Sequence, residues 1–353
     1  MNAFARPAAA LLLCASLSAS LSAQPVNYEL VTVGSPGNAP DFTTFGAVAY
    51  PYRIGRHEVT VADYAAFLNA VARTDTYGLW NNGMQAGATG AGITRSGAPG
   101  SHVYAPMTAI SGSAPYSANG TPPFRTISGV DSSRFPITFV SWLSAARFAN
   151  WMANGQPTGA QDATTTEDGA YRLAGATRGG APALNATNPN TGQPPTFRIP
   201  TENEWYKAAY YDPQLNGGRG GYHRYATRSD TPPGNAVPGS GAVSTQPSSN
   251  QANYIYGASY LYSVTQAAAI VTTQHYLTPV GTFADTRSPW GALDMNGSVW
   301  EINTLGGTGS LNIGIRGGAW TSLASYLAST YFLGTVTYST ASNVGFRLAA
   351  PAP

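Results

Sequence analysis

The sequence contains a single cysteine, Cys14, in 353 residues. It lies in an N-terminal segment that we expect to be removed, which would leave no thiol for a disulfide, a nucleophile or a metal site. Charged residues are also scarce, at 10% of the chain, and the formal net charge is only +2. Because no basic run is present, the composition gives no indication of a nucleic-acid partner.

Long apolar runs are missing as well, since a membrane-spanning helix needs about 20 consecutive apolar residues. Residues 1–23 instead have the pattern of a secretory signal, with Arg6 near the amino terminus, a short apolar stretch from Ala8 to Leu17 and a small-residue cleavage site ending at Ala23. A lipoprotein anchored through Cys14 is the alternative, and the bulky Leu13 before the cysteine disfavours it. We therefore expect a secreted or periplasmic protein whose mature chain has no transmembrane segment.

What the chain does contain indicates a folded, loop-rich body. Apolar residues make up 43% of it, with 40 glycines, 26 prolines and 21 tyrosines. We expect one domain over residues 24–353, with two insertions rich in small and polar residues near 76–133 and 154–195.

Few regular elements are predicted. Strands are expected at 52–59 and 134–140. Three helices are expected from their N-cap residues and apolar spacing, and they begin after Thr60, Ser141 and Thr201. In the last of them, Thr201 and Glu204 form a capping box, and the helix should end by Asp212. So few elements in so long a chain predict an irregular α+β fold.

Two carboxylates, Asp294 and Glu301, lie seven residues apart on either side of Gly297. A glycine allows the tight turn that would bring side chains and carbonyls around one ion. Such an oxygen-rich set suits a hard cation, calcium above all. The alternative is that both acids are ordinary hydrogen-bonded loop residues.

Six segments, taken in order, resemble the formylglycine-generating enzyme, or sulfatase-modifying factor, family. The resemblance runs from about residue 28 to 350 and implies an irregular variant of the C-type lectin fold with calcium as a structural ion. The segments are Glu58 to Tyr64, Phe135 to Trp142, Arg198 to Trp205, Gly291 to Glu301, Arg316-Gly-Gly-Ala-Trp320 and Gly345-Phe-Arg347.

The resemblance implies particular calcium ligands. A first ion would be held by the side chains of Asp294 and Glu301 and by the carbonyls of Gly297 and Val299. For a second ion, Asn253 and the carbonyl of Tyr254 match the first half of the family's site. The acidic ligand that should follow near residue 272 is missing, which weakens that second site.

The family oxidises a substrate cysteine with two cysteines that bind copper(I). The positions that match them here are Ser322 and Leu327, and neither side chain is a ligand for that soft ion. We therefore expect no copper and no oxidase activity.

Two functions from different classes follow. The first is a binding or structural module for a peptide, protein or glycan, with a ligand groove formed by Arg316, Trp320, Ser322, Tyr326 and Tyr331. For Arg316, as for Arg347, a structural role is favoured over ligand contact. The alternative is an enzyme with altered oxidoreductase chemistry at a mononuclear non-haem metal, which needs at least two histidines or carboxylates converging near Ser322. The four histidines, His57, His102, His223 and His275, are scattered in the sequence.

Overall fold

The computed structural model describes residues 25–85, 92–108, 113–114, 125–126, 131–238, 242, 244–270, 274–307 and 309–353. The predicted signal segment and Cys14 lie outside these residues. In the described part of the chain, no helix is both long and apolar enough to cross a membrane.

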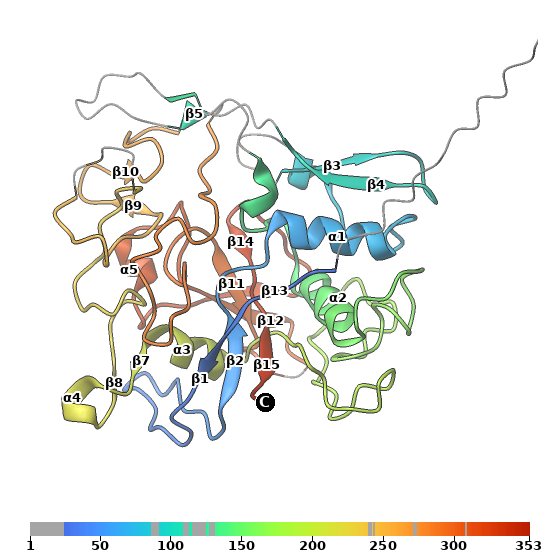
Figure 1. Ribbon diagram of the computed structural model, residues 1–353, viewed down its shortest axis with the longest axis horizontal. Helices are drawn as coiled ribbons and strands as arrows, with labels where there is room; N and C mark the ends of the chain where they lie inside the picture. The colour runs from blue at the N-terminus through green and yellow to red at the C-terminus, as the bar shows by residue number, and fades with distance from the viewer. Residues whose placement is uncertain are drawn as a thin grey trace, which may run out of the picture.

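Two sheets form the centre of the molecule (Figure 1). The first has the strand order β1–β2–β15, in which β1 (Leu30–Val33) and β15 (Ala349–Pro351) both pair antiparallel with β2 (Tyr52–Gly55). The strands near the two ends of the described chain therefore lie in one sheet, on either side of β2. The second sheet has the order β13–β12–β11–β14, and its strands are β11 (Trp300–Asn303), β12 (Asn312–Arg316), β13 (Leu333–Val336) and β14 (Val344–Gly345).

Short hairpins surround these sheets, and each is a two-stranded antiparallel pair. They are β3 (Ile93–Ser96) with β4 (Val103–Pro106), β5 (Ser113–Ala114) with β6 (Arg125–Thr126), β7 (Tyr211–Asp212) with β8 (Gly221–Tyr222), and β9 (Ile255–Tyr256) with β10 (Leu261–Tyr262). Two 3₁₀ turns, η1 (Asn82–Gln85) and η3 (Ser132–Arg134), complete the first insertion.

The three predicted helices are present and begin where their caps predict. They are α1 (Val61–Val71), α2 (Trp142–Ala153) and α3 (Glu202–Tyr210). The hydroxyl of Thr201 accepts the N–H of Glu204, whose carboxylate accepts the N–H of Thr201, so the capping box forms as expected. Two short helices, α4 (Leu215–Gly218) and α5 (Ala324–Leu327), were not predicted.

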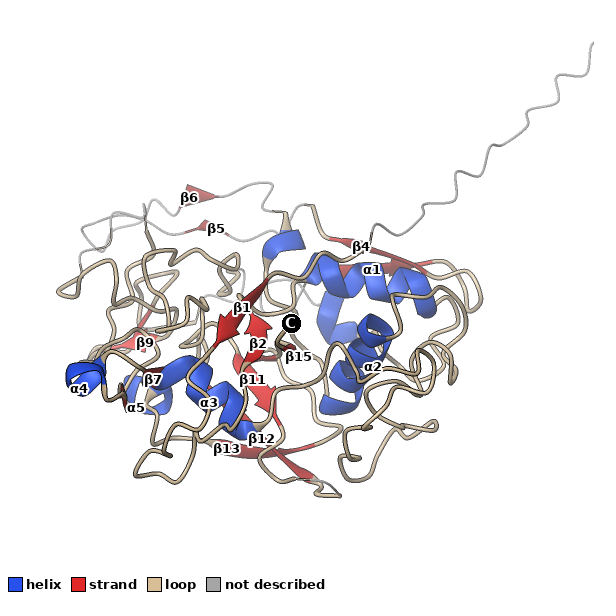
Figure 2. Cartoon of the chain, turned by 60° about the horizontal axis from the view of Figure 1, so that its bottom comes forward, coloured by secondary structure: helices blue, strands red, loops and turns tan. Residues whose placement is uncertain are grey.

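Aromatic packing between α1 and α2 forms much of the larger core. The ring of Phe148 stacks on Tyr64 with centroids 6.0 Å apart and meets Phe67 edge-on at 5.3 Å. All three side chains are fully buried, and burying each contributes about 1.5–3 kcal/mol. These two helices lie on one side of the central strands and α3 lies on the other (Figure 2).

The fold differs from the predicted strands and insertions in three places. The strand expected at 52–59 is shorter than predicted, because β2 ends at Gly55. Residues 134–140 do not form a strand: Pro136 makes a single bridge to Thr60, and Phe139 has a φ of 58°, which breaks an extended run. The first insertion is more regular than predicted, because the β3–β4 hairpin packs on α1.

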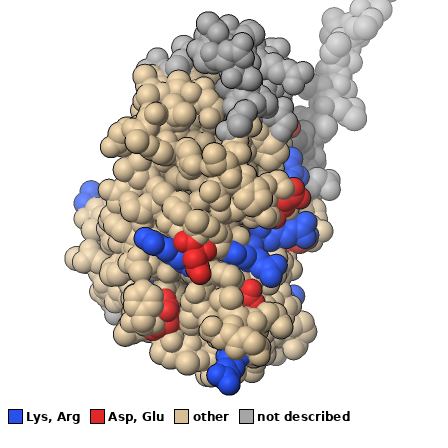
Figure 3. Space-filling model, turned by 90° about the vertical axis from the view of Figure 1, so that its left-hand side faces the viewer, with Lys and Arg blue, Asp and Glu red and all other residues tan. Residues whose placement is uncertain are grey.

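Figure 3 shows one face of the molecule, on which acidic and basic side chains are scattered over a mostly uncharged surface. This distribution agrees with the small charged fraction of the sequence.

Candidate functional site

The second sheet brings the three C-terminal family segments together. Glu301 on β11 lies opposite Arg316 on β12, and on its other side it lies opposite Gly345 on β14. Segments 291–301, 315–320 and 344–348 are therefore neighbours in space, as their shared membership of one site predicts.

Arg347 neutralises Glu301. The Nε and Nη2 atoms of Arg347 donate to the two carboxylate oxygens of Glu301 at 2.5 and 2.6 Å, and the indole N–H of Trp205 donates to the same carboxylate at 2.8 Å. Arg347 also donates to the backbone carbonyls of Gly55 and Leu293. Because Arg347 and Glu301 are almost completely buried, this bidentate pair joins β2, β11 and the turn before β11 in the interior.

A third carboxylate, Glu58, lies beside this pair and is fully buried. Its Oε2 is 3.9 Å from Nη2 of Arg347, and among the described residues neither of its oxygens has a hydrogen-bond partner. Burial, and then the nearby charge of Asp294, raise the pKa of Glu58 well above its usual range. Burial also raises the pKa of Asp294, although the N–H of Gly281 donates to it at 2.5 Å.

A calcium ion fits this segment only in part. Glu301 is already held by Arg347, whereas Asp294 borders a small cavity of about 10 Å³, the size of one water molecule, beside Thr286 and Asn296. Gly297 makes the expected turn, with a φ of 80°. In the part of the chain that the structure describes, no three histidines, cysteines or acids are grouped so that they could hold a metal. The four-residue calcium site stays a prediction. Of its two carboxylates, only Glu301 pairs with an arginine among the described residues.

The residues predicted for a second calcium have protein partners. The amide of Asn253 donates to the carbonyl of Tyr276 at 2.8 Å, and the carbonyl of Tyr254 accepts from Asn235 at 3.2 Å. Residues 271–273, where the missing acid was expected, lie outside the described residues.

Arg316 is an interior residue that binds the backbone of the segment carrying the predicted groove. It is fully buried, pairs with Glu202, and donates to the carbonyls of Ser329 and Tyr331 at 2.8 and 2.9 Å. Its guanidinium also lies over the ring of Phe332 at 5.3 Å. These contacts support the structural role favoured for this arginine.

Positions 322 and 327 face the same glycine. A Cβ atom at Gly318 would lie 2.5 Å from Cδ1 of Leu327 and 3.5 Å from Cβ of Ser322. The Ser322 hydroxyl accepts the N–H of Ala319 at 2.9 Å, and both Ser322 and Leu327 are buried. Two side chains five residues apart therefore meet around one point.

The other groove residues divide between interior and surface. Trp320 is 3% exposed and stacks on Tyr276 with centroids 4.9 Å apart. Tyr326 and Tyr331 are half-buried, pack edge to face at 4.5 Å and lead into Phe332, which is 45% exposed. The tyrosines are therefore the groove residues nearest to solvent, while Trp320 and Ser322 are covered.

Comparison with known proteins identifies the family. Residues 39–352 match the family model described as the sulfatase-modifying factor enzyme 1-like domain. The chain belongs to this family. The fold, mixed α+β with little regular secondary structure, is that of the sulfatase-modifying factor domain, as the resemblance predicted.

Several solved structures are similar at low sequence identity. Treponema denticola variable protein 1 is 16% identical, with a TM-score of 0.47, and the match covers 92% of this chain and 95% of that one. CarF is 20% identical (TM-score 0.45; 92% and 99% covered), and PvdO from Pseudomonas aeruginosa is 17% identical (TM-score 0.42; 92% of each chain covered). No curated protein sequence matches the chain.

The four histidines of this sulfatase-modifying factor domain have separate neighbours, and His102 lies against Tyr104 with ring centroids 6.1 Å apart. His223 lies 3.3 Å from Asp212, His275 stacks on Phe135 at 4.5 Å, and His57 contacts the carbonyl of Glu58. Within the described ranges no metal-binding group of three such residues forms. The alternative of a non-haem metal enzyme, which needs two converging ligands near Ser322, stays a prediction.

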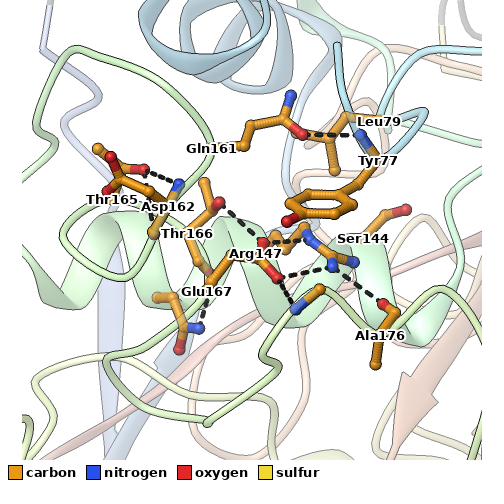
Figure 4. Close-up of polar contacts among 12 residues, drawn as sticks. Tyr77, Leu79, Ser144, Arg147, Gln161, Asp162, Thr165, Thr166, Glu167 and Ala176 are labelled. Carbon is orange, nitrogen blue, oxygen red and sulfur yellow. Dashed lines mark hydrogen bonds and ion pairs between the residues drawn. The ribbon is translucent and has the colours of Figure 1, made fainter.

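The sequence did not predict a second polar site, centred on Arg147 in α2. This arginine is 2% exposed and donates through Nε and Nη2 to the two carboxylate oxygens of Glu167, at 2.6 and 2.9 Å (Figure 4). A charged residue among the apolar positions of the predicted helix after Ser141 was the signal that could have pointed to it.

Proposed function

We propose that this sulfatase-modifying factor domain does not oxidise cysteine and serves as a binding or structural module. The observation that carries the proposal is the pair Ser322 and Leu327, which the family resemblance aligns with the copper-binding cysteines and which meet around Gly318. A hydroxyl and an isobutyl group cannot replace two thiolates for copper(I). Since Cys14 is the only cysteine in the sequence, no other thiol can take their place.

The binding role is supported by the aromatic side chains that follow Arg316. Tyr326, Tyr331 and Phe332 reach the surface on a segment whose backbone Arg316 holds through the carbonyls of Ser329 and Tyr331. Rigid aromatic rings on a fixed loop form contact surfaces at little cost in conformational entropy. The ligand class proposed is a peptide, protein or glycan met outside the cytoplasm, in the secreted or periplasmic location predicted from residues 1–23.

Calcium is retained in the proposal as a structural ion at the Asp294 side of segment 291–301. Arg347 supplies the positive charge at Glu301, so Asp294, with the carbonyls of Gly297 and Val299, is the set that would hold the ion. Its contribution would be to the stability of the fold, because an ion that binds only the native state raises its stability by mass action.

The test is an aldehyde-forming assay on a cysteine-containing peptide with copper(I) supplied. We expect no product from the wild-type chain and no stoichiometric copper by metal analysis. The matched variant is Ser322→Cys with Leu327→Cys, which should acquire copper(I) binding because the two positions meet around Gly318. Aldehyde formed by the wild-type chain would overturn the proposal.

A further inference from the structure

A cavity of about 440 Å³ lies where α2, the 77–83 loop and the 338–340 loop meet. Its volume falls within the roughly 300–1,000 Å³ of small-molecule sites. It shares no lining residue with the predicted groove, so its role does not depend on whether the domain oxidises cysteine. The residues used below to argue for a ligand are Tyr77, Asn82, Ser144, Arg147, Tyr338 and Thr340, and all of them line it.

The three walls of this cavity are tied to one another. The Asn81 amide donates to the carbonyl of Phe139 at 2.9 Å, which holds the 77–83 loop to the segment before α2. The N–H of Leu143 donates to the carbonyl of Thr337 at 3.1 Å, and the Thr337 hydroxyl donates to Gly179. A ligand would therefore meet a largely preformed site, which lowers the entropy cost of binding.

Arg147, one of the residues that line this cavity, has an unused hydrogen-bond donor. Its Nε and Nη2 atoms are occupied by Glu167 and by the carbonyl of Ala176, whereas Nη1 has no acceptor among the described residues (Figure 4). The guanidinium lies over the ring of Tyr77 at 4.4 Å, which fixes its plane. A structural role explains two of the three nitrogens, and the third is left to bind an oxygen atom inside the cavity.

The chemistry of the lining selects against a charged ligand. Glu167 neutralises Arg147 and is itself held by the N–H of Gly175 at 2.8 Å and the Thr166 hydroxyl at 3.0 Å. Among the described residues, no acidic residue and no second basic residue lines the cavity. An anion at Nη1 would lie close to the Glu167 carboxylate and be repelled by it.

What remains is a set of hydroxyls, one amide and two aromatic rings. Ser144, Thr340 and Tyr338 offer hydroxyls that both donate and accept, and Asn82 offers an amide. Arg178 lies over the ring of Tyr338 at 4.8 Å and holds it in place. We propose that this cavity binds a short neutral saccharide, with a ring hydroxyl on Nη1 of Arg147 and the sugar's apolar face against Tyr77 or Tyr338.

Saturation-transfer NMR and calorimetry on the full chain, with a panel of neutral mono- and disaccharides, test this proposal. The main variant is Thr340→Trp, in which an exposed residue at the rim is enlarged to fill the cavity, and the control is Thr231→Trp, at an exposed threonine outside the lining. We expect at least one saccharide to bind the wild type, about tenfold weaker binding to Thr340→Trp at an unchanged melting temperature, and wild-type binding to the control.

A second variant, Arg147→Lys, keeps a positive charge beside Glu167 but removes the forked donor, and it should also weaken binding. If it does not fold, Thr340→Trp decides alone. The proposal is overturned if no neutral saccharide binds, if Thr340→Trp binds as the wild type does, or if only inorganic phosphate or acidic saccharides bind.

Discussion

Replacing Arg347 should remove the central link between the two sheets. In the variant Arg347→Met the side chain keeps much of its length, but the Glu301 carboxylate loses both charged hydrogen bonds. Breaking a buried ion pair from one side costs about 3–5 kcal/mol, because the remaining charge is left in the interior. Domains of ordinary stability have a free energy of unfolding of about 5–15 kcal/mol, so the loss would be a large fraction of the total.

Urea denaturation at neutral pH would measure this loss, with Glu301→Gln and the double variant completing a cycle. We expect the double variant to lose less than the sum of the two single variants, with a coupling of about 1–3 kcal/mol. Arg53→Met is the matched control, since Arg53 makes one exposed hydrogen bond to the carbonyl of Pro351, and its cost should be about 0.5 kcal/mol or less.

The same cycle separates an arginine from a calcium ion as the partner of Glu301. Repeated with calcium and with a chelator, the coupling between Arg347 and Glu301 should not change. A loss below about 1 kcal/mol for Arg347→Met, or a coupling that appears only when the chelator is added, would refute the assignment of Glu301 to the arginine. A chelator-dependent fall in the melting temperature that Asp294→Asn abolishes would support calcium at Asp294 instead.

Three further variants test local features. Burial raises the pKa of Glu58, so this group contributes stability below its unfolded pKa of about 4.3 that is lost as pH rises through its folded pKa. Glu58→Gln should flatten that decline in a pH series of unfolding free energies, whereas a variant less stable than wild type at neutral pH would indicate that Glu58 binds a cation. Gly318→Ala should cost about 1–3 kcal/mol by calorimetry, since its Cβ would lie 2.5 Å from Leu327, and more than Gly78→Ala, whose Cβ would meet nothing within 4 Å; equal costs would contradict this. Thr201→Ala should cost about 1 kcal/mol in urea denaturation by removing a helix cap, and no loss would contradict the capping box.

The helices could be predicted because their signals are local. Thr60, Ser141 and Thr201 each cap the helix that begins at the next residue, by accepting the N–H group three residues further on. The structure has all three caps as expected. The strand expected at 134–140 was wrong because its apolar residues are buried by packing and by one bridge to Thr60. An apolar run signals burial, and only a partner strand makes it a strand.

The sequence indicated which residues belong to the candidate site but not which of them form ion pairs. Asp294 and Glu301 are near in sequence, so the prediction joined them around one ion. In the structure Glu301 pairs with Arg347, which is 46 residues away, while the calcium site stays a prediction. Arg147 and Glu167 are 20 residues apart and raise the same difficulty. The fold decides which acid pairs with which base when the two are distant in the sequence. Local sequence patterns do not show such pairs.

The three arginines Arg147, Arg316 and Arg347 explain how a chain with so little charge stabilises so many loops. Each is nearly or fully buried, pairs with a glutamate, and also donates to at least one backbone carbonyl outside regular hydrogen bonding between strands. A loop that enters the interior must satisfy its carbonyl groups, and a planar guanidinium can do this while its charge is neutralised on the other side. Arg347 supplies positive charge at Glu301, one of the side chains that the family resemblance assigns to calcium, and the same kind of pair recurs at Glu202 and Glu167. Among the described residues Nη2 of Arg316 also has no hydrogen-bond partner, but it is buried. Of the three arginines only Arg147 lines the cavity of about 440 Å³, and this position sets it apart as a ligand-binding residue.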